Sequence, residues 1–153
     1  MVEMKQGHNS DYSKTREKMI EEQLITRGIK DEKVLAAFRS VPRHKFVPDN
    51  LKENAYEDRP LPIKEGQTIS QPFIVAQMVE ALKPEAGDKC LEIGTGSGYA
   101  TAILSQIVDE VHSIERYQTL ARKAEKRFRD LEYENIKVHV GDGTLGWPET
   151  APY

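Results

Sequence analysis

A glycine-rich segment, residues 92–98 with the sequence Glu-Ile-Gly-Thr-Gly-Ser-Gly, is the first candidate for chemistry in this chain. It follows a short apolar run, so we expect it where a strand turns into a helix. Glycines in such a turn permit positive φ and let a ligand approach the backbone closely. The spacing lacks the last glycine of the dinucleotide fingerprint, where Tyr99 stands, and it lacks the Lys-Ser/Thr pair of a P-loop. A nucleotide-like ligand without a pyrophosphate is favoured, and a plain glycine-rich turn is the alternative.

Two acidic residues follow the next two apolar runs at matching positions. Glu115 stands 21 residues after Gly94, where a carboxylate can accept hydrogen bonds from both hydroxyls of a ribose. Asp142 lies between two glycines one run later and can accept from the exocyclic amine of an adenine; a simple turn residue is its alternative. Open α/β sheets bind ligands at the carboxyl ends of adjacent parallel strands. A ribose and an adenine without a pyrophosphate indicate S-adenosylmethionine.

Alternating apolar runs and amphipathic stretches supply the elements that must position these residues. Strands are predicted at 89–93, 111–114 and 136–140, and helices at 99–108 and 117–131. Elements of these lengths in this alternation are typical of a parallel sheet with helices on its faces. The sequence therefore predicts an α/β fold whose residues 85–153 form a cofactor-binding sheet.

The first 84 residues are predicted to form helices and a long connecting segment. One helix spans 11–26 and stops before Gly28, and a second begins at the candidate N-cap Asp31. A third starts at Pro72, and its predicted apolar face consists of Ile74, Val75, Met78, Val79 and Leu82. The proline-rich residues 41–67 are interpreted as a functional, substrate-facing loop. Residues 1–153 together are predicted to form a single domain.

Composition narrows the classes of partner and compartment. With 22 Lys and Arg against 25 Asp and Glu, the net charge of −3 provides no field for attracting nucleic acid or an anionic membrane. The one cysteine, Cys90, cannot form an internal disulfide, so a reducing, cytoplasmic location is predicted. No apolar stretch reaches the roughly 18 residues of a membrane span.

Two other groups of residues are given ordinary structural interpretations. His44 and His112 have no Cys, His or carboxylate cluster at metal-ligand spacing, so we expect packed or surface histidines and no metal site. Basic residues recur between Arg116 and Arg129 and could contact RNA phosphates. Interleaved acids favour a solvated helix face instead.

Several stretches, taken together, resemble signatures of the protein-L-isoaspartate O-methyltransferase family. They are residues 41–48 (Val-Pro-Arg-His-Lys-Phe-Val-Pro), 55–58 (Ala-Tyr-Glu-Asp), 60–63 (Pro-Leu-Pro-Ile), 66–72 (Gly-Gln-Thr-Ile-Ser-Gln-Pro), 91–99 and 141–146. The resemblance implies a Rossmann-like S-adenosylmethionine-dependent methyltransferase fold with N-terminal helices. It also implies metal-independent methyl transfer to the α-carboxylate of L-isoaspartyl residues in damaged proteins, with S-adenosylhomocysteine as the product.

The resemblance places the functional serine of the family at Ser70. Its hydroxyl would orient the acceptor carboxylate by a hydrogen bond, and a cap of the third helix is the alternative. A carboxylate with a pKa of about 4 is ionised at pH 7, so positioning is the main task and no general base is needed. The residues expected to contact the cofactor are Thr68, Gln71, Glu92, Gly94, Thr95, Gly96, Ser97, Glu115, Asp142 and Gly143.

The chain departs from the family pattern in two places. A fourth strand, beside the first, would begin where this chain ends, at Tyr153. The sheet is therefore expected to be truncated, with residues 89–93 at an open edge, and we expect self-association through that edge or marginal folding, with little methyl transfer. Lys64-Glu65 replace residues that are more often small or neutral in the family, and this change is expected to retune peptide preference.

Two alternative functions stay open from the sequence. The glycine and acid motifs alone also fit a methyltransferase for RNA or a small molecule, and only residues 67–72 argue against it. The second alternative is a fragment that binds S-adenosylmethionine without turnover.

Overall fold

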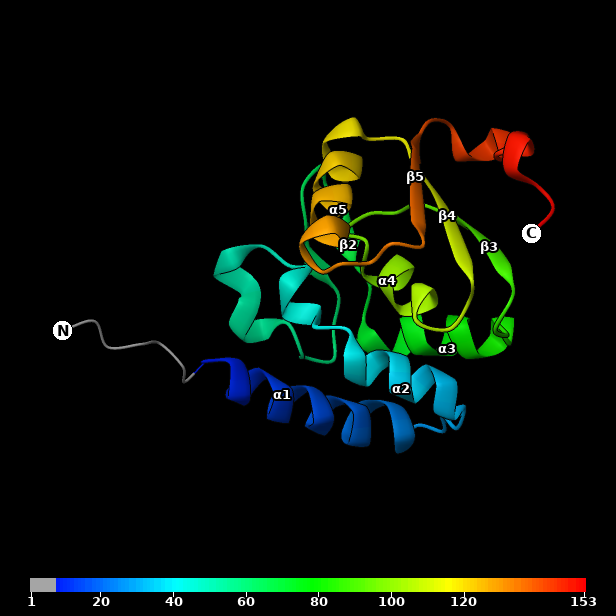
Figure 1. The fold of residues 1–153 in the computed structure, drawn as a ribbon. Coiled ribbons are helices and arrows are strands. Elements are labelled where there is room, and N and C mark those ends of the chain that lie inside the picture. Colours follow the sequence, from blue (N-terminus) through cyan, green and yellow to red (C-terminus); the bar gives the residue numbers. More distant parts are fainter. Residues whose placement is uncertain (1–7) are drawn as a thin grey trace.

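A three-stranded parallel sheet forms the frame of the structure, a computed structural model that describes residues 8–153. Its strands are β3 (Lys89–Ile93), β4 (Glu110–Glu115) and β5 (Ile136–Val140), in the order β3-β4-β5 (Figure 1). Strand β4 lies in the centre because it pairs with both neighbours, and five of its six residues are buried. The strands fall where the apolar runs predicted them, and β3 lies at an edge as expected.

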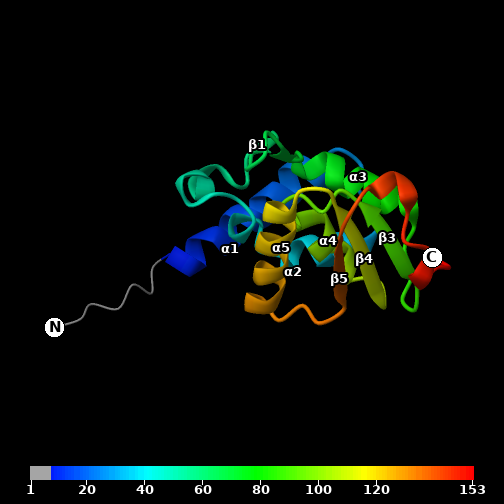
Figure 2. The same cartoon turned by 90° about the horizontal axis from the view of Figure 1, so that it is seen from above.

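Two helices return the chain between the parallel strands. They are α4 (Tyr99–Ser105) and α5 (Gln118–Asp130), and both pack against β4 and β5. Both connections run in the same direction across the sheet, so right-handed crossovers place the two helices on one face (Figure 2). The buried residues of α5 recur at helical spacing and face the sheet: Leu120, Ala121, Ala124 and Phe128.

The N-terminal elements cover the far side of α4. Helix α1 (His8–Met19) continues directly into a π-helical stretch, η1 (Ile20–Ile25), and α2 (Glu32–Ser40) packs on α4. The predicted N-cap of α2 is confirmed, because the Asp31 carboxylate accepts a hydrogen bond from the Lys33 amide at 2.9 Å. Phe38 of α2 then packs edge-on against Tyr99 at the start of α4, with ring centres 5.9 Å apart.

The predicted loop at 41–67 contains regular turns that the sequence pattern did not indicate. Two 3₁₀ turns, η2 (Arg43–Lys45) and η3 (Asp49–Asn54), are followed by a short hairpin of β1 (Leu61–Pro62) and β2 (Thr68–Ile69). Glu65 and Gly66 at the tip of the hairpin have φ of 58° and 63°, as a type I′ turn requires. The hairpin carries the chain from the prolines into the start of α3.

Helix α3 (Pro72–Leu82) lies where it was predicted, but three of the five residues of its predicted apolar face are exposed. Val75 and Val79 are buried, whereas Ile74, Met78 and Leu82 are 40%, 55% and 57% exposed. The helix packs on η1 and α2 with one side only, and Met78 and Leu82 line a cavity beside β3. Apolar periodicity identified the helix but could not show which neighbours cover it.

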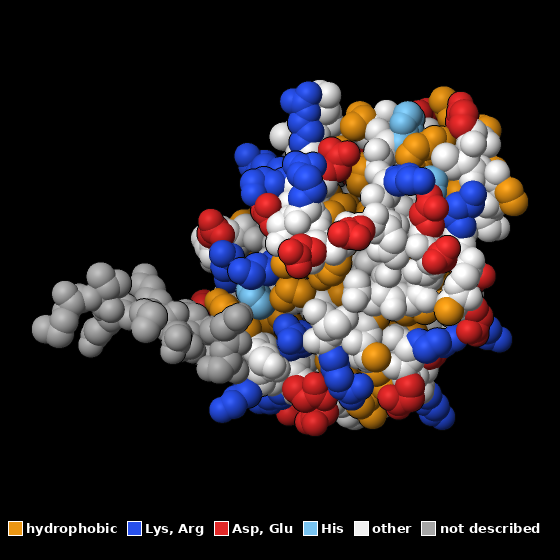
Figure 3. Space-filling view, viewed as in Figure 1, with side chains coloured by type: hydrophobic (Ala, Val, Ile, Leu, Met, Phe, Trp, Pro, Cys, Tyr) orange, Lys and Arg blue, Asp and Glu red, His pale blue; other side chains and the backbone are white. Residues whose placement is uncertain are grey.

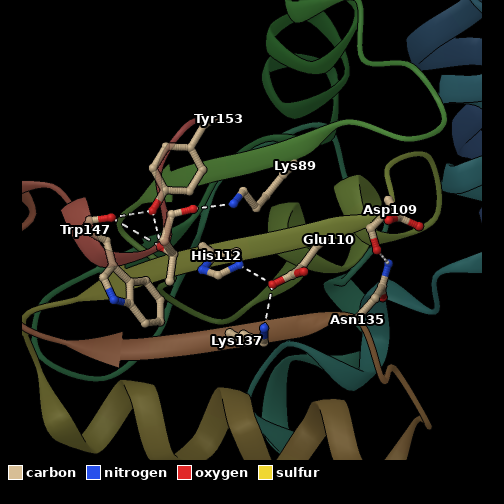
Figure 4. A network of polar contacts seen from close by, with 9 residues as sticks. Lys89, Asp109, Glu110, His112, Asn135, Lys137, Trp147 and Tyr153 are labelled. Carbon is tan, nitrogen blue, oxygen red and sulfur yellow. Dashed lines mark hydrogen bonds and ion pairs between the residues drawn. The ribbon is translucent and has the colours of Figure 1, made fainter.

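Aromatic and polar contacts hold the last residues against the sheet (Figure 4). Glu110 accepts a hydrogen bond from Lys137 Nζ at 2.6 Å and also contacts His112 Nε2. The ring of His112 is 1% exposed and meets Trp147 and Tyr153 edge-on, with ring centres 4.9 and 5.8 Å away. His112 is therefore a packed residue, one of the two positions predicted for it. No helix among the described residues is both long and apolar enough to cross a membrane.

Candidate functional site

A cleft follows the carboxyl ends of the three parallel strands. It consists of three adjoining cavities of about 370, 210 and 410 Å³. Ile93, Gly94 and Gly96 line both the first and the second cavity, and Arg116 and Gly143 line both the second and the third. The structure thus brings the glycine segment, the end of β4 and the end of β5 to one continuous surface, as parallel strand ends require.

The glycine segment forms the floor of the first two cavities. Gly94 and Gly96 have φ of 94° and 56°, a region that residues with a Cβ rarely adopt. A Cβ built on Gly94 would meet no atom within 4 Å, and one on Gly96 would meet only Ile63 Cδ1, at 3.8 Å. Both positions therefore leave bare backbone facing open space, where a ligand can come close.

Glu115 sits beneath this loop and is 4% exposed. Its Oε2 accepts a hydrogen bond from the Gly96 amide at 2.8 Å, and its Oε1 accepts one from the Tyr117 amide at 3.0 Å. Each carboxylate oxygen has a further lone pair, so these two bonds leave acceptor capacity for hydroxyl groups of a ligand. The carboxylate both fixes the loop and lines the second cavity.

Glu92 lies at the inner wall of the first cavity. Ser113 Oγ donates to its Oε2 at 2.6 Å, and Thr101 Oγ1 donates to the same oxygen. Burial raises the pKa of Glu92 to about 7; the two hydroxyl hydrogen bonds oppose this shift and the charge of Glu115 adds to it. A cation bound in this cavity would favour the ionised carboxylate.

The raised pKa of Glu92 leads to a prediction about stability. The folded chain binds more protons at this group than the unfolded chain does between pH 4.5 and about 7. Its contribution to stability is therefore present below pH 4.5 and is lost as the pH rises through 7. Glu92→Gln removes the ionisation and should raise the free energy of unfolding at pH 8 by on the order of 2–3 kcal/mol, with no gain at pH 4.

Urea unfolding at pH 4, 6 and 8 measures this difference, with the exposed acid Glu134, replaced by Gln, as the matched control. The comparison between variant and parent is needed because His44 acts in the opposite direction. Burial lowers the pKa of His44 from 6.5 to about 4, so its contribution is present above pH 6.5 and is lost as the pH falls through 4. A gain for Glu92→Gln that does not change with pH would contradict the assignment.

Ser70 and its neighbours lie at the rim of the first cavity. Ser70 and Thr68 are exposed and line it, together with the glycine segment. Ser70 does not cap α3, because Gln71 occupies the N-cap position and no side-chain cap is formed. The side-chain Nε2 of Gln71 instead donates to Asp58 Oδ1 at 2.6 Å, and Gln71 does not line the cleft.

The end of β5 supplies the third cavity. Asp142 is exposed there, and its Oδ1 accepts hydrogen bonds from the Thr144 amide at 2.9 Å and the Thr144 hydroxyl at 2.7 Å. These bonds belong to a turn, which was the alternative interpretation, yet the residue also lines the cavity. A Cβ on Gly143 would lie 2.3 Å from Ile93 Cγ2, so only glycine lets this turn approach the end of β3.

Thr95 and Ser97 belong to the loop but point their hydroxyls inward. Thr95 Oγ1 lies 2.6 Å from Ser113 Oγ, and Ser97 Oγ accepts a hydrogen bond from the Tyr99 amide at 3.3 Å. Both residues are buried and line the first cavity. Their side chains hold the loop, so that a ligand would meet mainly its backbone.

Among the cleft residues that sequence reasoning missed are Ile93 and Arg116. Ile93 is 56% exposed and lines the first and second cavities, and Arg116 lines the second and third. Each is adjacent in sequence to a predicted site residue at a strand end, and that position was the available signal. Ile93 was counted as part of an apolar strand and Arg116 as part of a basic run.

The basic residues of α5 are exposed to solvent, apart from one that is partly buried (Figure 3). Lys126 pairs with Asp130 at 2.5 Å on the exposed side. Arg127, by contrast, donates from Nη1 to the Ser97 carbonyl at 3.1 Å and supports the glycine loop. In the described part of the chain, no group of three or more His, Cys, Asp or Glu side chains could hold a metal ion.

Comparison with known protein families gives a match over most of the chain. A family model described as protein-L-isoaspartate(D-aspartate) O-methyltransferase matches residues 14–153. The protein-L-isoaspartate O-methyltransferase of Pelotomaculum thermopropionicum is 58% identical over 138 residues, which are 90% of this chain and 60% of that protein. Protein-L-isoaspartate O-methyltransferase 2 of Pelobacter propionicus is 60% identical over 145 residues, 95% of this chain and 64% of that protein. The chain spans about three fifths of the length of these curated relatives.

Solved structures show the same architecture. A protein-L-isoaspartate O-methyltransferase superposes with a TM-score of 0.79 at 32% identity, over 90% of this chain and 45% of the other. A beta-aspartate methyltransferase (PCMT) from Plasmodium falciparum, in complex with S-adenosyl-L-homocysteine, superposes with a TM-score of 0.68 at 25% identity, over 85% and 62%. These superpositions confirm the predicted α/β, Rossmann-like methyltransferase fold.

Proposed function

Because the chain belongs to the protein-L-isoaspartate O-methyltransferase family, we propose that it binds S-adenosylmethionine in the cleft and methylates the α-carboxylate of L-isoaspartyl residues in damaged proteins. The observation that carries this proposal is the placement of Ser70 on the same cavity as Gly94 and Gly96. A cofactor held against the exposed glycine backbone and an acceptor held by the Ser70 hydroxyl would both lie in the first cavity.

The residues of the cleft fit the proposed cofactor. Cavities of about 370 and 210 Å³ adjoin over the glycine loop, and ligand pockets typically measure roughly 300–1,000 Å³. Glu115 keeps free lone pairs beside the second cavity for ribose hydroxyls, and Asp142 stands at the third for an adenine amine. The complex of the Plasmodium protein with S-adenosyl-L-homocysteine supports this choice of ligand.

The chain's own residues would position the reactants. S-adenosylmethionine, when bound, supplies a methyl group on a positively charged sulfonium. The isoaspartyl carboxylate is already ionised at neutral pH, so no residue has to remove a proton. Ser70 donates a hydrogen bond to one carboxylate oxygen and leaves the other directed at the methyl group, while the apolar side chains of Val75 and Val79 form the inner wall. Orientation is the main contribution of the protein.

The roles of individual residues and the cellular location are proposed on the same grounds. We propose that Thr68, Glu92, Gly94, Gly96, Glu115, Asp142 and Gly143 contact the cofactor, with Thr95 and Ser97 holding the loop and Gln71 holding the Ser70 segment. The unpaired, partly buried Cys90 supports a reducing, cytoplasmic location for the repair reaction.

Methyl transfer to matched peptides tests the proposed function. The chain, completed to the length of its curated relatives, is incubated with methyl-labelled S-adenosylmethionine and an isoaspartyl peptide, its normal aspartyl twin, or tRNA. We expect base-labile label in the isoaspartyl peptide alone. Label in tRNA or equally in both peptides would contradict the proposal, and cofactor binding without transfer to any acceptor would favour binding without turnover.

The variant Ser70→Ala tests the role of the serine in the same assay. Loss of its hydrogen bond to a charged carboxylate should lower kcat/KM for the isoaspartyl peptide by about tenfold or more. Affinity for S-adenosylhomocysteine, measured by calorimetry, should stay within about twofold, because the bond is made to the acceptor. Normal turnover by this variant would remove Ser70 from the mechanism.

A further inference from the structure

Arg43 is a fully buried cation at the base of the Ser70 segment. Its side chain is 0% exposed, and its Nε donates to the Ala55 carbonyl at 2.6 Å. Its Nη2 donates to the Ser70 carbonyl at 2.9 Å. Its guanidinium carbon lies 4.9 Å from the centre of the Tyr99 ring. Arg43 therefore touches three segments that are far apart in the sequence.

The surroundings of Arg43 are unusual for a buried charge. None of the ion pairs among the described residues includes it, and burial lowers its pKa. Buried cations are costly unless carbonyl dipoles, aromatic faces or carboxylates compensate them. Here two carbonyls and the Tyr99 ring contact the guanidinium, Tyr99 and Tyr56 favour its charged form, and its Nη1 has no hydrogen-bond partner among the described residues. The planar fork of arginine can reach two acceptors at once, which a lysine ammonium on a flexible stem does poorly.

The three contacts converge on the functional cleft. Ser70 is the residue whose hydroxyl faces the acceptor in the proposed function, and Tyr99 begins the helix that follows the glycine loop. Ala55 ends the 3₁₀ turn before the hairpin. Fixing the Ser70 carbonyl relative to Tyr99 fixes the distance between the acceptor side and the cofactor side of the first cavity.

We propose that Arg43 is a positioning residue that holds Ser70 in register with the cofactor loop. This inference rests on the proposed function, since it assigns Arg43 a role in methyl transfer through Ser70. Arg43 touches neither the cleft nor a reactant. It acts through the carbonyl of Ser70, whose hydroxyl faces the acceptor in the proposed function.

A double-mutant cycle separates positioning from mere stabilisation. Arg43→Lys keeps the charge but loses the fork, and we expect kcat for the isoaspartyl peptide to fall by about tenfold, with the affinity for S-adenosylhomocysteine changed by less than about twofold. In the double variant Arg43→Lys, Ser70→Ala the loss should equal that of Ser70→Ala alone, because a misplaced serine and an absent one have the same effect. The matched control is Arg59→Lys, an exposed arginine of the same segment that pairs with Glu57.

Amide hydrogen exchange provides a readout that does not need turnover. At equal global stability, exchange of the peptide covering residues 68–72 should accelerate in Arg43→Lys and not in Arg59→Lys. Should Arg43→Lys fail to unfold cooperatively, Arg43→Gln, which loses the fork and, unlike lysine, carries no charge, takes its place. Losses that add fully in the cycle, or unchanged exchange at 68–72, would overturn the positioning role. Absence of methyl transfer by the parent chain completed to the length of its relatives would refute the proposed function and leave the exchange test of Arg43 intact.

Discussion

Glu115→Ala is expected to weaken binding of S-adenosylhomocysteine by roughly tenfold or more, which corresponds to the 1.5–3 kcal/mol of hydrogen bonds to a charged acceptor. Two effects add in this variant. The ligand loses the carboxylate that would accept its ribose hydroxyls, and the Gly96 amide loses the acceptor that holds it at 2.8 Å. Calorimetric titration of the folded variant measures the change.

Two further variants separate these effects. Glu115→Gln keeps the size of the side chain and one oxygen, so it should retain more affinity than Glu115→Ala. The exposed residue Glu134, replaced by Ala, serves as the control and should leave affinity unaltered. If Glu115→Ala bound S-adenosylhomocysteine as tightly as the parent, the ligand would not contact the end of β4.

Gly98→Ala is expected to reduce the free energy of unfolding by about 2–5 kcal/mol, through strain and overpacking together. Gly98 has φ of 89°, and a Cβ there would lie 2.6 Å from Phe128 Cζ and 2.8 Å from Cε1. Phe128 is 4% exposed, so its ring cannot move into solvent without opening the contact between α5 and the sheet.

Gly87→Ala is the matched control for Gly98→Ala. Gly87 has φ of 94°, but a Cβ there would meet nothing within 4 Å. Gly87→Ala should therefore reduce the free energy of unfolding only by the strain of the left-handed conformation, about 1–2 kcal/mol. Urea unfolding of both variants followed by circular dichroism measures the difference, and equal losses would show that the contact with Phe128 carries no weight.

The elements of the sheet could be predicted because their signals are local. The apolar runs at β3 and β5 ended at glycines, and the acid of β4 stood 21 residues after Gly94, so the strand ends and the residues that meet there followed from spacing alone. Parallel strand ends meet at one edge whatever the details of packing. The cleft therefore followed from the order of the elements.

Other features depend on contacts between distant segments, which no periodicity records. The hairpin that pairs Leu61 with Ile69 joins two stretches too short to show alternation. Tight hairpin turns are usually marked by Asn-Gly or Asp-Gly. At the tip of this hairpin the pair is Glu65-Gly66, and Glu65 adopts a positive φ. Prolines marked the region as irregular but did not indicate which residues would pair.

Arg43 shows the same limit for the functional site. In the sequence it is one basic residue of a signature stretch, and basic residues are usually exposed. Its burial arises because Ala55, Ser70 and Tyr99 converge on it from three segments. Only the tertiary arrangement brings this surface-type residue into contact with the Ser70 segment and Tyr99.

Amide hydrogen exchange with and without S-adenosylhomocysteine tests most directly whether the ends of β3, β4 and β5 form one cofactor site. Saturating ligand should slow exchange in peptides that cover residues 92–98, 115–117 and 141–144, because these backbone segments line the three adjoining cavities. Peptides from the surface groove at residues 125–138 should be unaffected. Protection confined to that groove, or binding with no protection at the three strand ends, would contradict the cofactor site.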